Sequence, residues 1–168
     1  MRKIKLLIMS LVAVAFYSCE PTYVKTYSWA YPVAGDWMVK AYIDGAEVGG
    51  PYEIKSYNSA FGKDSIWIDD YGSSTLDTKT NKWTIVPGNF WTMKFKTGVD
   101  MTSKTFSTAG STSAIGGYQI GIKVLNGKVI NNDSIYFEIQ FEDDSTPYGT
   151  TYQLKGHREV SYEEYTQQ

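Results

Sequence analysis

Hydrophobic and polar residues alternate over much of the chain. In segment 35–45, every second residue from Trp37 onward is apolar, whereas Lys40 and Tyr42 occupy positions in between. Successive side chains of a strand point to opposite faces, so a period of two predicts a strand with one buried side. The same alternation recurs in the C-terminal half of the chain, most regularly at residues 134–141.

Further short segments of this kind follow one another without any long helical run. Strands are expected at residues 52–61, 65–70, 83–86, 90–97, 105–106, 118–124, 134–141 and 150–158. About eight strands at short spacing predict an all-β antiparallel barrel, because closure of the sheet removes its exposed edges. A barrel of this size has either a filled interior or room for one small ligand.

Turn residues separate the predicted strands. Asp44-Gly45, Gly49-Gly50-Pro51 and residues 143–147 are expected to be turns. Asn126-Gly127 predicts a two-residue hairpin, because both positions of that turn need positive φ. The polar stretch 71–82 is expected to be largely loop.

The face of the strands that is predicted to point inward is apolar. It comprises Val39, Ile43, Ile54, Ile66, Ile68, Met93, Phe95, Ile120, Ile122, Ile135, Phe137, Ile139 and Leu154. These residues are candidates for lining a hydrophobic ligand cavity. They would equally suit a filled core, because both environments are lined by the same residue types.

Two distant residues are predicted to point into the barrel. Trp37 follows Gly35 at the start of the first strand, where a large indole can plug one end of a closed barrel, and Arg158 has inward parity at the end of the last strand.

The N-terminus has the pattern of an export signal. A basic start, an apolar stretch and Ser18-Cys19 resemble a bacterial lipobox, which implies lipidation of Cys19. We therefore expect a signal peptide at 1–18, a lipidated tether at 19–34, a barrel at 35–160 and a polar tail at 161–168. The alternatives are an ordinary signal peptide, with Cys19 as a free thiol, and an uncleaved anchor. The expected location is the bacterial cell envelope, as an outer-membrane lipoprotein on either face.

Composition and charge agree with a β domain and argue against nucleic-acid binding. The chain contains 14 Tyr, 5 Trp and 15 Gly, which suit pleated sheets and tight turns. Cleavage after residue 18 would remove 3 of the 16 basic residues and leave all 18 acidic ones. That acidic balance gives no electrostatic footprint for DNA or RNA.

No arrangement of residues predicts catalysis, a metal or a cofactor. His157 is the single histidine and has outward parity, with no nucleophile or orienting partner that the sequence can assign to it. The acidic pairs at Asp69-Asp70 and in 142–144 are expected to be solvated turns, with a calcium or glycosidase site as weaker readings. Trp67 and Tyr42 have outward parity and are candidates for binding a glycan or protein partner.

Two resemblances follow from these motifs. Gly35-x-Trp37 with Arg158 resembles the signature of the lipocalin or calycin superfamily, in which the arginine packs across the tryptophan. The chain as a whole resembles a family of small Bacteroidetes lipoproteins described as lipid-binding putative hydrolases with a lipocalin-like barrel. The similar pieces are residues 35–40, 64–70, 90–96, 126–129, 133–139 and 156–158.

The leading hypothesis is therefore a lipid-anchored, non-catalytic barrel that binds a small hydrophobic, lipid-like ligand. The alternative is a cell-surface interaction module with a filled barrel that binds glycan or a partner protein through exposed aromatic residues. A weak hydrolase comes third, because the family label implies an enzyme whereas the residues show no catalytic arrangement.

Overall fold

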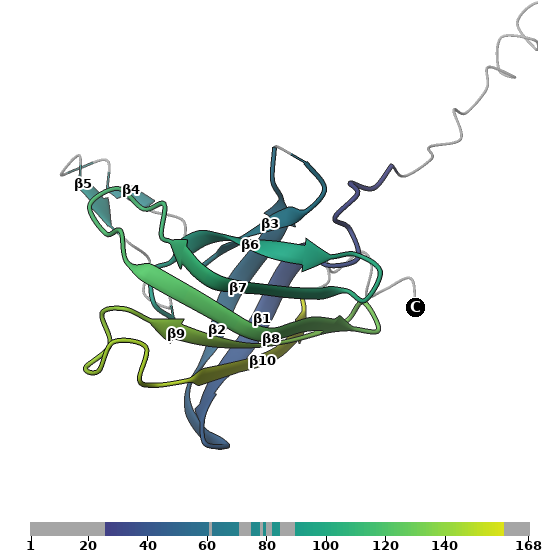
Figure 1. The fold of residues 1–168 in the computed structure, drawn as a ribbon. Coiled ribbons are helices and arrows are strands. Elements are labelled where there is room, and N and C mark those ends of the chain that lie inside the picture. The colour runs from purple at the N-terminus through teal and green to yellow at the C-terminus, as the bar shows by residue number, and fades with distance from the viewer. Residues whose placement is uncertain are drawn as a thin grey trace, which may run out of the picture.

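A computed structural model describes residues 26–60, 62–70, 75–77, 79, 82–84 and 90–159. Eight strands close into an antiparallel barrel in the order β1-β10-β9-β8-β7-β6-β3-β2 (Figure 1). The strands of the barrel are β1 (Gly35–Ile43), β2 (Ala46–Asn58), β3 (Ser65–Asp69), β6 (Lys94–Asp100), β7 (Thr105–Thr112), β8 (Gly121–Ile130), β9 (Ser134–Phe141) and β10 (Tyr152–Arg158). The described residues contain no helix, which confirms the prediction of an all-β, eight-stranded antiparallel barrel.

Two predicted strands differ from those of the structure. The segment predicted at 83–86 lies partly in β5 (Lys82–Thr84), which pairs with β4 (Thr75–Asp77) in a separate two-stranded sheet and not in the barrel wall. The strand predicted at 90–97 begins only at Lys94, because the backbone before it turns at Thr92 with a φ of 56°. The wall gains length instead from β7, which continues to Thr112.

The first hairpin confirms one turn prediction and corrects another. Asp44 and Gly45 have positive φ values of 49° and 84° and join β1 to β2 directly, because Ile43 pairs with Ala46. Residues 49–51, predicted to be a turn, instead lie inside β2. The register of β1 against β2 shifts there, which is the mark of a β-bulge that bends a strand.

The prediction of a hairpin at Asn126-Gly127 is wrong for a similar reason. Both residues lie within β8, where the register against β9 shifts between Leu125 and Lys128. Gly127 is opposite Phe106, and a Cβ atom at Gly127 would lie 2.4 Å from the phenyl ring. The absence of a side chain at Gly127 therefore allows the Phe106 ring to pack against the backbone of β8. The turn between β8 and β9 lies at residues 131–133.

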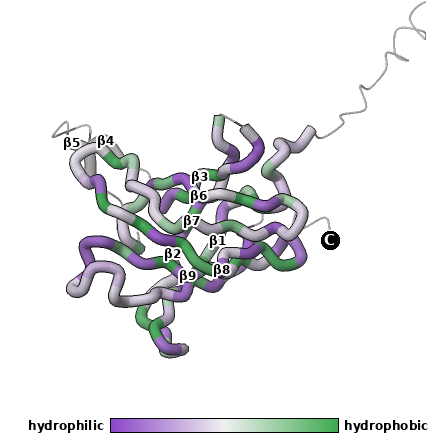
Figure 2. Tube along the Cα trace, viewed as in Figure 1, coloured by the Kyte–Doolittle hydropathy of each residue, from purple (hydrophilic) through white to green (hydrophobic). Residues whose placement is uncertain are grey.

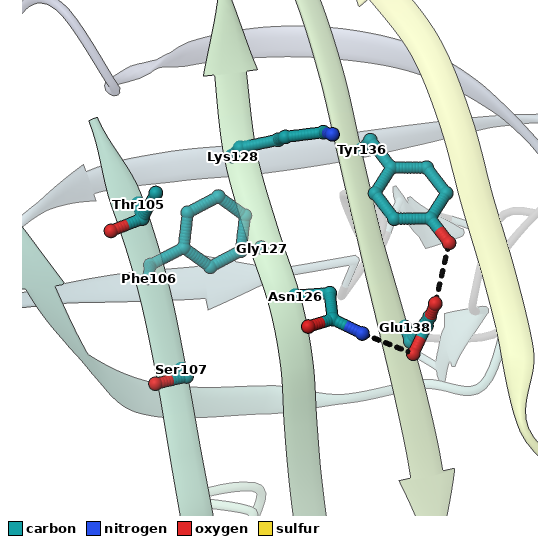
Figure 3. A pocket seen from close by; sticks show the side chains of 8 residues that line it. All are labelled: Thr105, Phe106, Ser107, Asn126, Gly127, Lys128, Tyr136 and Glu138. Atoms are coloured by element: carbon teal, nitrogen blue, oxygen red, sulfur yellow. Dashed lines mark hydrogen bonds between the residues drawn. The ribbon is translucent and has the colours of Figure 1, made fainter. Parts of the chain in front are cut away.

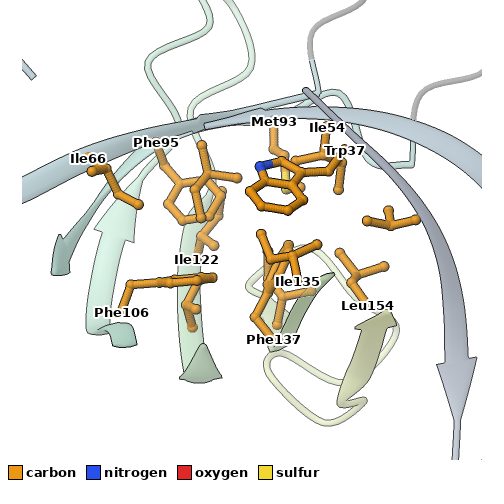
Figure 4. Packing of buried hydrophobic residues seen from close by; sticks show 14 of the residues in the cluster. Trp37, Ile54, Ile66, Met93, Phe95, Phe106, Ile122, Ile135, Phe137 and Leu154 are labelled. Atoms are coloured by element: carbon orange, nitrogen blue, oxygen red, sulfur yellow. The ribbon is translucent and has the colours of Figure 1, made fainter. Parts of the chain in front are cut away.

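The barrel interior is a continuous apolar core. Hydrophobic and hydrophilic positions alternate along the wall (Figure 2), and the inward side chains from opposite walls pack together (Figure 4). Every residue of the predicted inward set is buried except Ile43, which is half-buried at the end of β1. Ala30 and Val33 are also fully buried, so the packed domain begins before Gly35, within the predicted tether.

Candidate functional site: an aromatic mouth opposite a closed end

One end of the barrel is closed by Trp37 and Arg158, which face each other in register between β1 and β10. The guanidinium carbon of Arg158 lies 4.3 Å from the centroid of the Trp37 ring. The Arg158 side chain donates through Nε to the Asn132 carbonyl at 2.8 Å and through Nη1 to the Ala34 carbonyl. The cation therefore ties together three segments that are far apart in the sequence.

Gly35 belongs to this arrangement for a steric reason. A Cβ atom at Gly35 would lie 2.1 Å from Nη1 of Arg158. Beneath the arginine, the indole Nε1 of Trp37 donates to Oγ of Ser56 at 2.7 Å, and that hydroxyl donates in turn to the Val33 carbonyl at 2.7 Å. The polar groups of this buried end thus have partners, as buried polar atoms require.

The opposite end of the barrel carries a cluster of aromatic rings, which we call the aromatic mouth: Tyr52, Phe90, Trp91, Phe141 and Tyr152. Phe141 is the last residue of β9 and Tyr152 is the first of β10, so both lie at the end away from Arg158. Trp91 stacks on Phe141 with ring centroids 4.2 Å apart and planes within 2°. Phe90 contacts Tyr52 and Tyr152, each with its ring centroid 5.5 Å away.

The exposure of the mouth distinguishes it from the rest of the core. Phe141 is fully buried, whereas the other four rings are half-buried and pack against the core from its rim. The barrel therefore offers apolar aromatic surface to a ligand at this end, continuous with the interior. At the closed end, by contrast, Trp37 has no exposed surface.

Asp70 fastens the mouth segment to the end of β3. Its carboxylate accepts hydrogen bonds from the backbone N–H groups of Trp91 at 2.7 Å, Thr92 at 3.2 Å and Met93. Asp70 is only 3% exposed, and burial raises the pKa of its carboxyl, although the three N–H donors oppose that shift. The prediction of a solvated turn is therefore wrong for Asp70, which is a structural acceptor.

A second carboxylate holds the outer edge of the mouth. Asp143 accepts from the indole Nε1 of Trp91 at 3.1 Å and from the hydroxyl of Tyr118. Burial, followed by the hydrogen bond to Asp143, raises the pKa of Tyr118 to about 12. Asp143 is exposed, as expected for a turn residue, and it holds two aromatic side chains in place through these hydrogen bonds.

The outward-facing candidates have partners that cover their rings. Trp67 is half-buried, with Nζ of Lys96 5.1 Å and Nζ of Lys94 5.8 Å from its ring. Tyr42 lies under Nζ of Lys155 at 4.6 Å. A lysine ammonium therefore lies beside each ring, and a role of Trp67 and Tyr42 in binding a glycan or protein partner stays a prediction.

His157 is exposed on the outer wall, in register with Met38 of β1. Within the described ranges, no three His, Cys, Asp or Glu side chains gather in a way that could hold a metal ion. No described segment forms a helix with the length and apolar character needed to cross a membrane. Cys19 lies outside the described residues.

The sequence pattern predicts the inward positions of two residues of the mouth but not how the five rings pack together. Period two correctly gives Phe141 and Tyr152 inward parity, yet their stacking with Phe90 and Trp91 depends on which strand ends meet. The role of Asp70 was missed because an acidic pair after a strand usually marks a solvated turn. The available signal was the aromatic pair Phe90-Trp91, which a solvent-exposed loop would not normally carry.

A closed, eight-stranded antiparallel barrel with one plugged end and an aromatic rim at the other defines a class of protein: a small β-barrel of a size that encloses either a filled interior or one small ligand. The chain belongs to the family described as lipid-binding putative hydrolase, which it matches over residues 22–163. A search of curated proteins gives no match.

Proposed function

We propose that the protein is a lipid-anchored, non-catalytic barrel that holds a small hydrophobic, lipid-like ligand at its aromatic mouth. The observation that carries this proposal is the half-buried cluster of Phe90, Trp91 and Tyr152, which packs against the mainly apolar core of the barrel. Membership of a lipid-binding family supports the class of ligand.

The packing of the interior limits how deeply such a ligand inserts. The interior beside Trp37 is filled by side chains without exposed surface, those of Phe95, Phe137 and Leu154. An acyl chain would therefore lie among the half-buried rings and displace them outward, with only its end reaching the core. Each methylene buried in this way contributes about 0.8 kcal/mol, so a chain held at the rim suits transient binding.

Attachment to the bacterial envelope, at the outer membrane, is the second part of the proposal. It rests on the lipobox-like sequence ending at Cys19. Acyl chains on that cysteine would hold the protein at a membrane essentially permanently. The first described residues, 26–34, pack against the closed end, where Val33 is buried and joined to Ser56. The tether would therefore leave from the end opposite the mouth.

Photo-crosslinking of the full chain in lipid nanodiscs tests the ligand. The probe is a palmitate analogue with a diazirine on its chain, and crosslinked peptides are mapped by mass spectrometry. We expect adducts on Phe90, Trp91 and Tyr152 that excess oleate removes. Trp91→Ala should reduce them, whereas Trp67→Ala on the outer wall should not. Adducts that oleate does not displace, or that spread evenly over the outer wall, would contradict binding at the mouth.

The anchor is tested separately by the intact mass of the membrane-extracted protein. We expect a mature chain that begins at Cys19 and carries acyl groups, and loss of those groups in Cys19→Ser. A mature chain without acyl mass would refute anchoring and leave the ligand experiment untouched.

A further inference from the structure

A groove runs across the outer wall of the barrel over β8, β9 and β10, well away from the mouth. It consists of two adjoining hollows of about 630 Å³ and about 340 Å³ that share Lys128 and Tyr136. The larger hollow lies toward β7 and contains Asn126 and Glu138 (Figure 3). The smaller lies toward β10, beside Lys155 and the exposed Ile130.

The bulge of β8 creates the larger hollow. Gly127 has no side chain, so the backbone there lies against the Phe106 ring, and the outer surface dips between the neighbouring strands. Asn126 takes a positive φ of 52° at the bulge, and its side chain turns toward Glu138 of β9. Bulges commonly re-aim a side chain at a functional position.

Two lysines flank Tyr136 in a single row across the sheet. Lys128 of β8 and Lys155 of β10 are both register partners of Tyr136. The contacts of these two lysines are with aromatic rings: Lys128 Nζ lies 5.4 Å from the Tyr136 ring, and Lys155 Nζ lies over Tyr42.

Three other lysines on the wall form ion pairs with carboxylates. Lys40 and Lys55 have a glutamate oxygen at 3.0 Å, and Lys94 has an aspartate oxygen at 3.1 Å. Among the described residues, Lys128 and Lys155 have no carboxylate oxygen within 4.0 Å. The charge of Lys128 is therefore available to an anion beside Tyr136. The ammonium group of Lys155 lies over Tyr42 of β1, and its side chain has to turn across β10 to reach the same anion.

The polar side chains beside them are fixed in orientation. Glu138 accepts from the Tyr136 hydroxyl at 2.6 Å and from Nδ2 of Asn126 at 2.9 Å (Figure 3). The hydrogen bond to Glu138 raises the pKa of Tyr136 to about 12, so the phenol remains a neutral hydroxyl. The remaining lone pairs of Glu138 and the Oδ1 atom of Asn126 then face the groove as acceptors.

We propose that this groove binds an acidic saccharide, a pyranose ring that carries a carboxylate. The sugar carboxylate pairs with Lys128, and Lys155 joins it by turning from Tyr42 toward Tyr136. The ring C–H groups contact Tyr136, and the sugar hydroxyls donate to Glu138 and Asn126. A neutral sugar would leave both ammonium groups without a partner. Inorganic phosphate has only one or two hydroxyl groups to donate to Glu138 and Asn126 and no ring C–H groups for Tyr136, so it would use less of the groove. This site is independent of the ligand proposed for the mouth.

Isothermal titration of the full chain in detergent micelles tests the site, with trigalacturonate as the probe. We expect Lys128→Met and Lys155→Met each to weaken binding about tenfold, because each removes a charge-assisted hydrogen bond. Lys123→Met is the matched control: Lys123 also lies in β8 over a tyrosine, at 4.0 Å from the Tyr148 ring, but outside the groove. Its affinity should be unchanged.

Competitors distinguish other occupants. Galactotriose, the neutral counterpart of the probe, should bind far more weakly. Equal affinity for galactotriose, or an equal loss in Lys123→Met, would overturn the proposal. So would saturation by inorganic phosphate or octanoate with the same dependence on Lys128 and Lys155, since the groove would then be a general anion or fatty-acid site. Absence of any binding heat for trigalacturonate also rejects it.

Discussion

The two ends of the barrel use aromatic side chains in opposite ways. At the closed end, one indole is fully buried, and the cation stacked on it is tied to backbone carbonyls of Ala34 and Asn132. At the mouth, four half-buried rings pack on one another, and the carboxylates of Asp70 and Asp143 hold Trp91 through its backbone N–H and its indole Nε1. Both ends bury apolar surface. At the mouth the rings that pack on the core are themselves half-buried, whereas at the closed end the core indole is fully buried and the exposed ring of Tyr31 lies outside the arginine.

This difference in burial suggests different roles for the two ends: the closed end stabilises the fold, and the mouth offers surface for a ligand. A fully buried ring contributes its whole transfer free energy to folding, whereas a half-buried ring retains apolar surface that a ligand can cover. The closed end should therefore behave as the rigid base of the fold. The mouth should tolerate change more readily, because its rings are fastened by a few side-chain hydrogen bonds and lie at the strand ends.

The largest effect is expected from Trp37→Ala. Truncation of a fully buried indole leaves a cavity and removes its bond to Ser56, which should lower the free energy of unfolding by about 3–5 kcal/mol. Urea denaturation measures the change. Trp67→Ala on the outer wall is the comparison and should cost only roughly 1–2 kcal/mol. Equal losses in the two variants would contradict the closed end as the base of the fold.

Arg158→Met should lower the free energy of unfolding by about 1–3 kcal/mol, because two carbonyl acceptors lose a charged donor. Gly35→Ala should act through the same contact, since the new methyl group would occupy the position of Nη1. The double variant should then be little less stable than Arg158→Met alone, because the two changes remove one interaction. Additive losses by denaturation would show that Gly35 serves another purpose.

Asp70→Asn should cost about 1–3 kcal/mol, because an amide cannot accept from all three N–H groups of the mouth segment. Asp69→Asn is the comparison: Asp69 pairs with Lys94 at 3.1 Å and accepts from the Tyr57 hydroxyl at 2.9 Å. An amide oxygen still accepts from Tyr57, so this variant should lose only about 0.5–1.5 kcal/mol. The loss in Asp70→Asn should also depend on pH.

The sign of that dependence follows from burial, which raises the pKa of Asp70 above 3.8 in the folded protein. Folded protein thus takes up this proton at a higher pH than unfolded protein does. The stabilisation is fully present below 3.8 and is lost as the pH rises through the folded pKa. The difference between wild type and Asp70→Asn should therefore grow on acidification, and a difference that shrinks would contradict the assignment.

The sequence predicts local features of each end, such as strand parity, better than contacts between residues that lie far apart in the chain. Strand parity gives Trp37 and Arg158 inward positions, because each lies on a regular strand whose period is unbroken, and their pairing is what the resemblance to the calycin signature implies. The glycine pairs failed as turn signals at Gly49-Gly50 and Asn126-Gly127, because glycine also permits bulges and close ring contacts within strands. Local residue preference cannot distinguish these uses, since the partner, such as Phe106, comes from another strand.

The mouth was harder to predict because it is built from irregular backbone. Phe90 and Trp91 precede β6 and are positioned by Asp70, 20 or more residues earlier in the chain. The sequence shows the aromatic pair and the acidic pair, but their juxtaposition requires the β3–β6 register that places Asp69 beside Lys94. Whether the inward residues line a cavity or fill a core also depends on packing, which the sequence does not show. Near the closed end the structure shows a filled core, because the inward residues there are fully buried.

The smallest effect tests whether carboxylates hold the mouth. Tyr118→Phe should lower the free energy of unfolding by only about 0.5–1.5 kcal/mol, the net contribution of one hydrogen bond. The more specific readout is the pKa of Tyr118, which is raised to about 12 by burial and by Asp143. Asp143→Asn removes the charge but not the burial, so the pKa should fall toward 10.0 without reaching it.

The measurement is tyrosinate absorbance during an alkaline titration of wild type and variant. Since the folded pKa of Tyr118 lies above 10.0, the stabilisation from its proton is present below that pH and is lost toward pH 12. Tyr136, whose pKa is also raised to about 12 but through Glu138, is the internal control and should titrate unchanged in Asp143→Asn. If no tyrosine shifts in that variant, Asp143 does not hold Tyr118, and the mouth is fastened by Asp70 and ring packing alone.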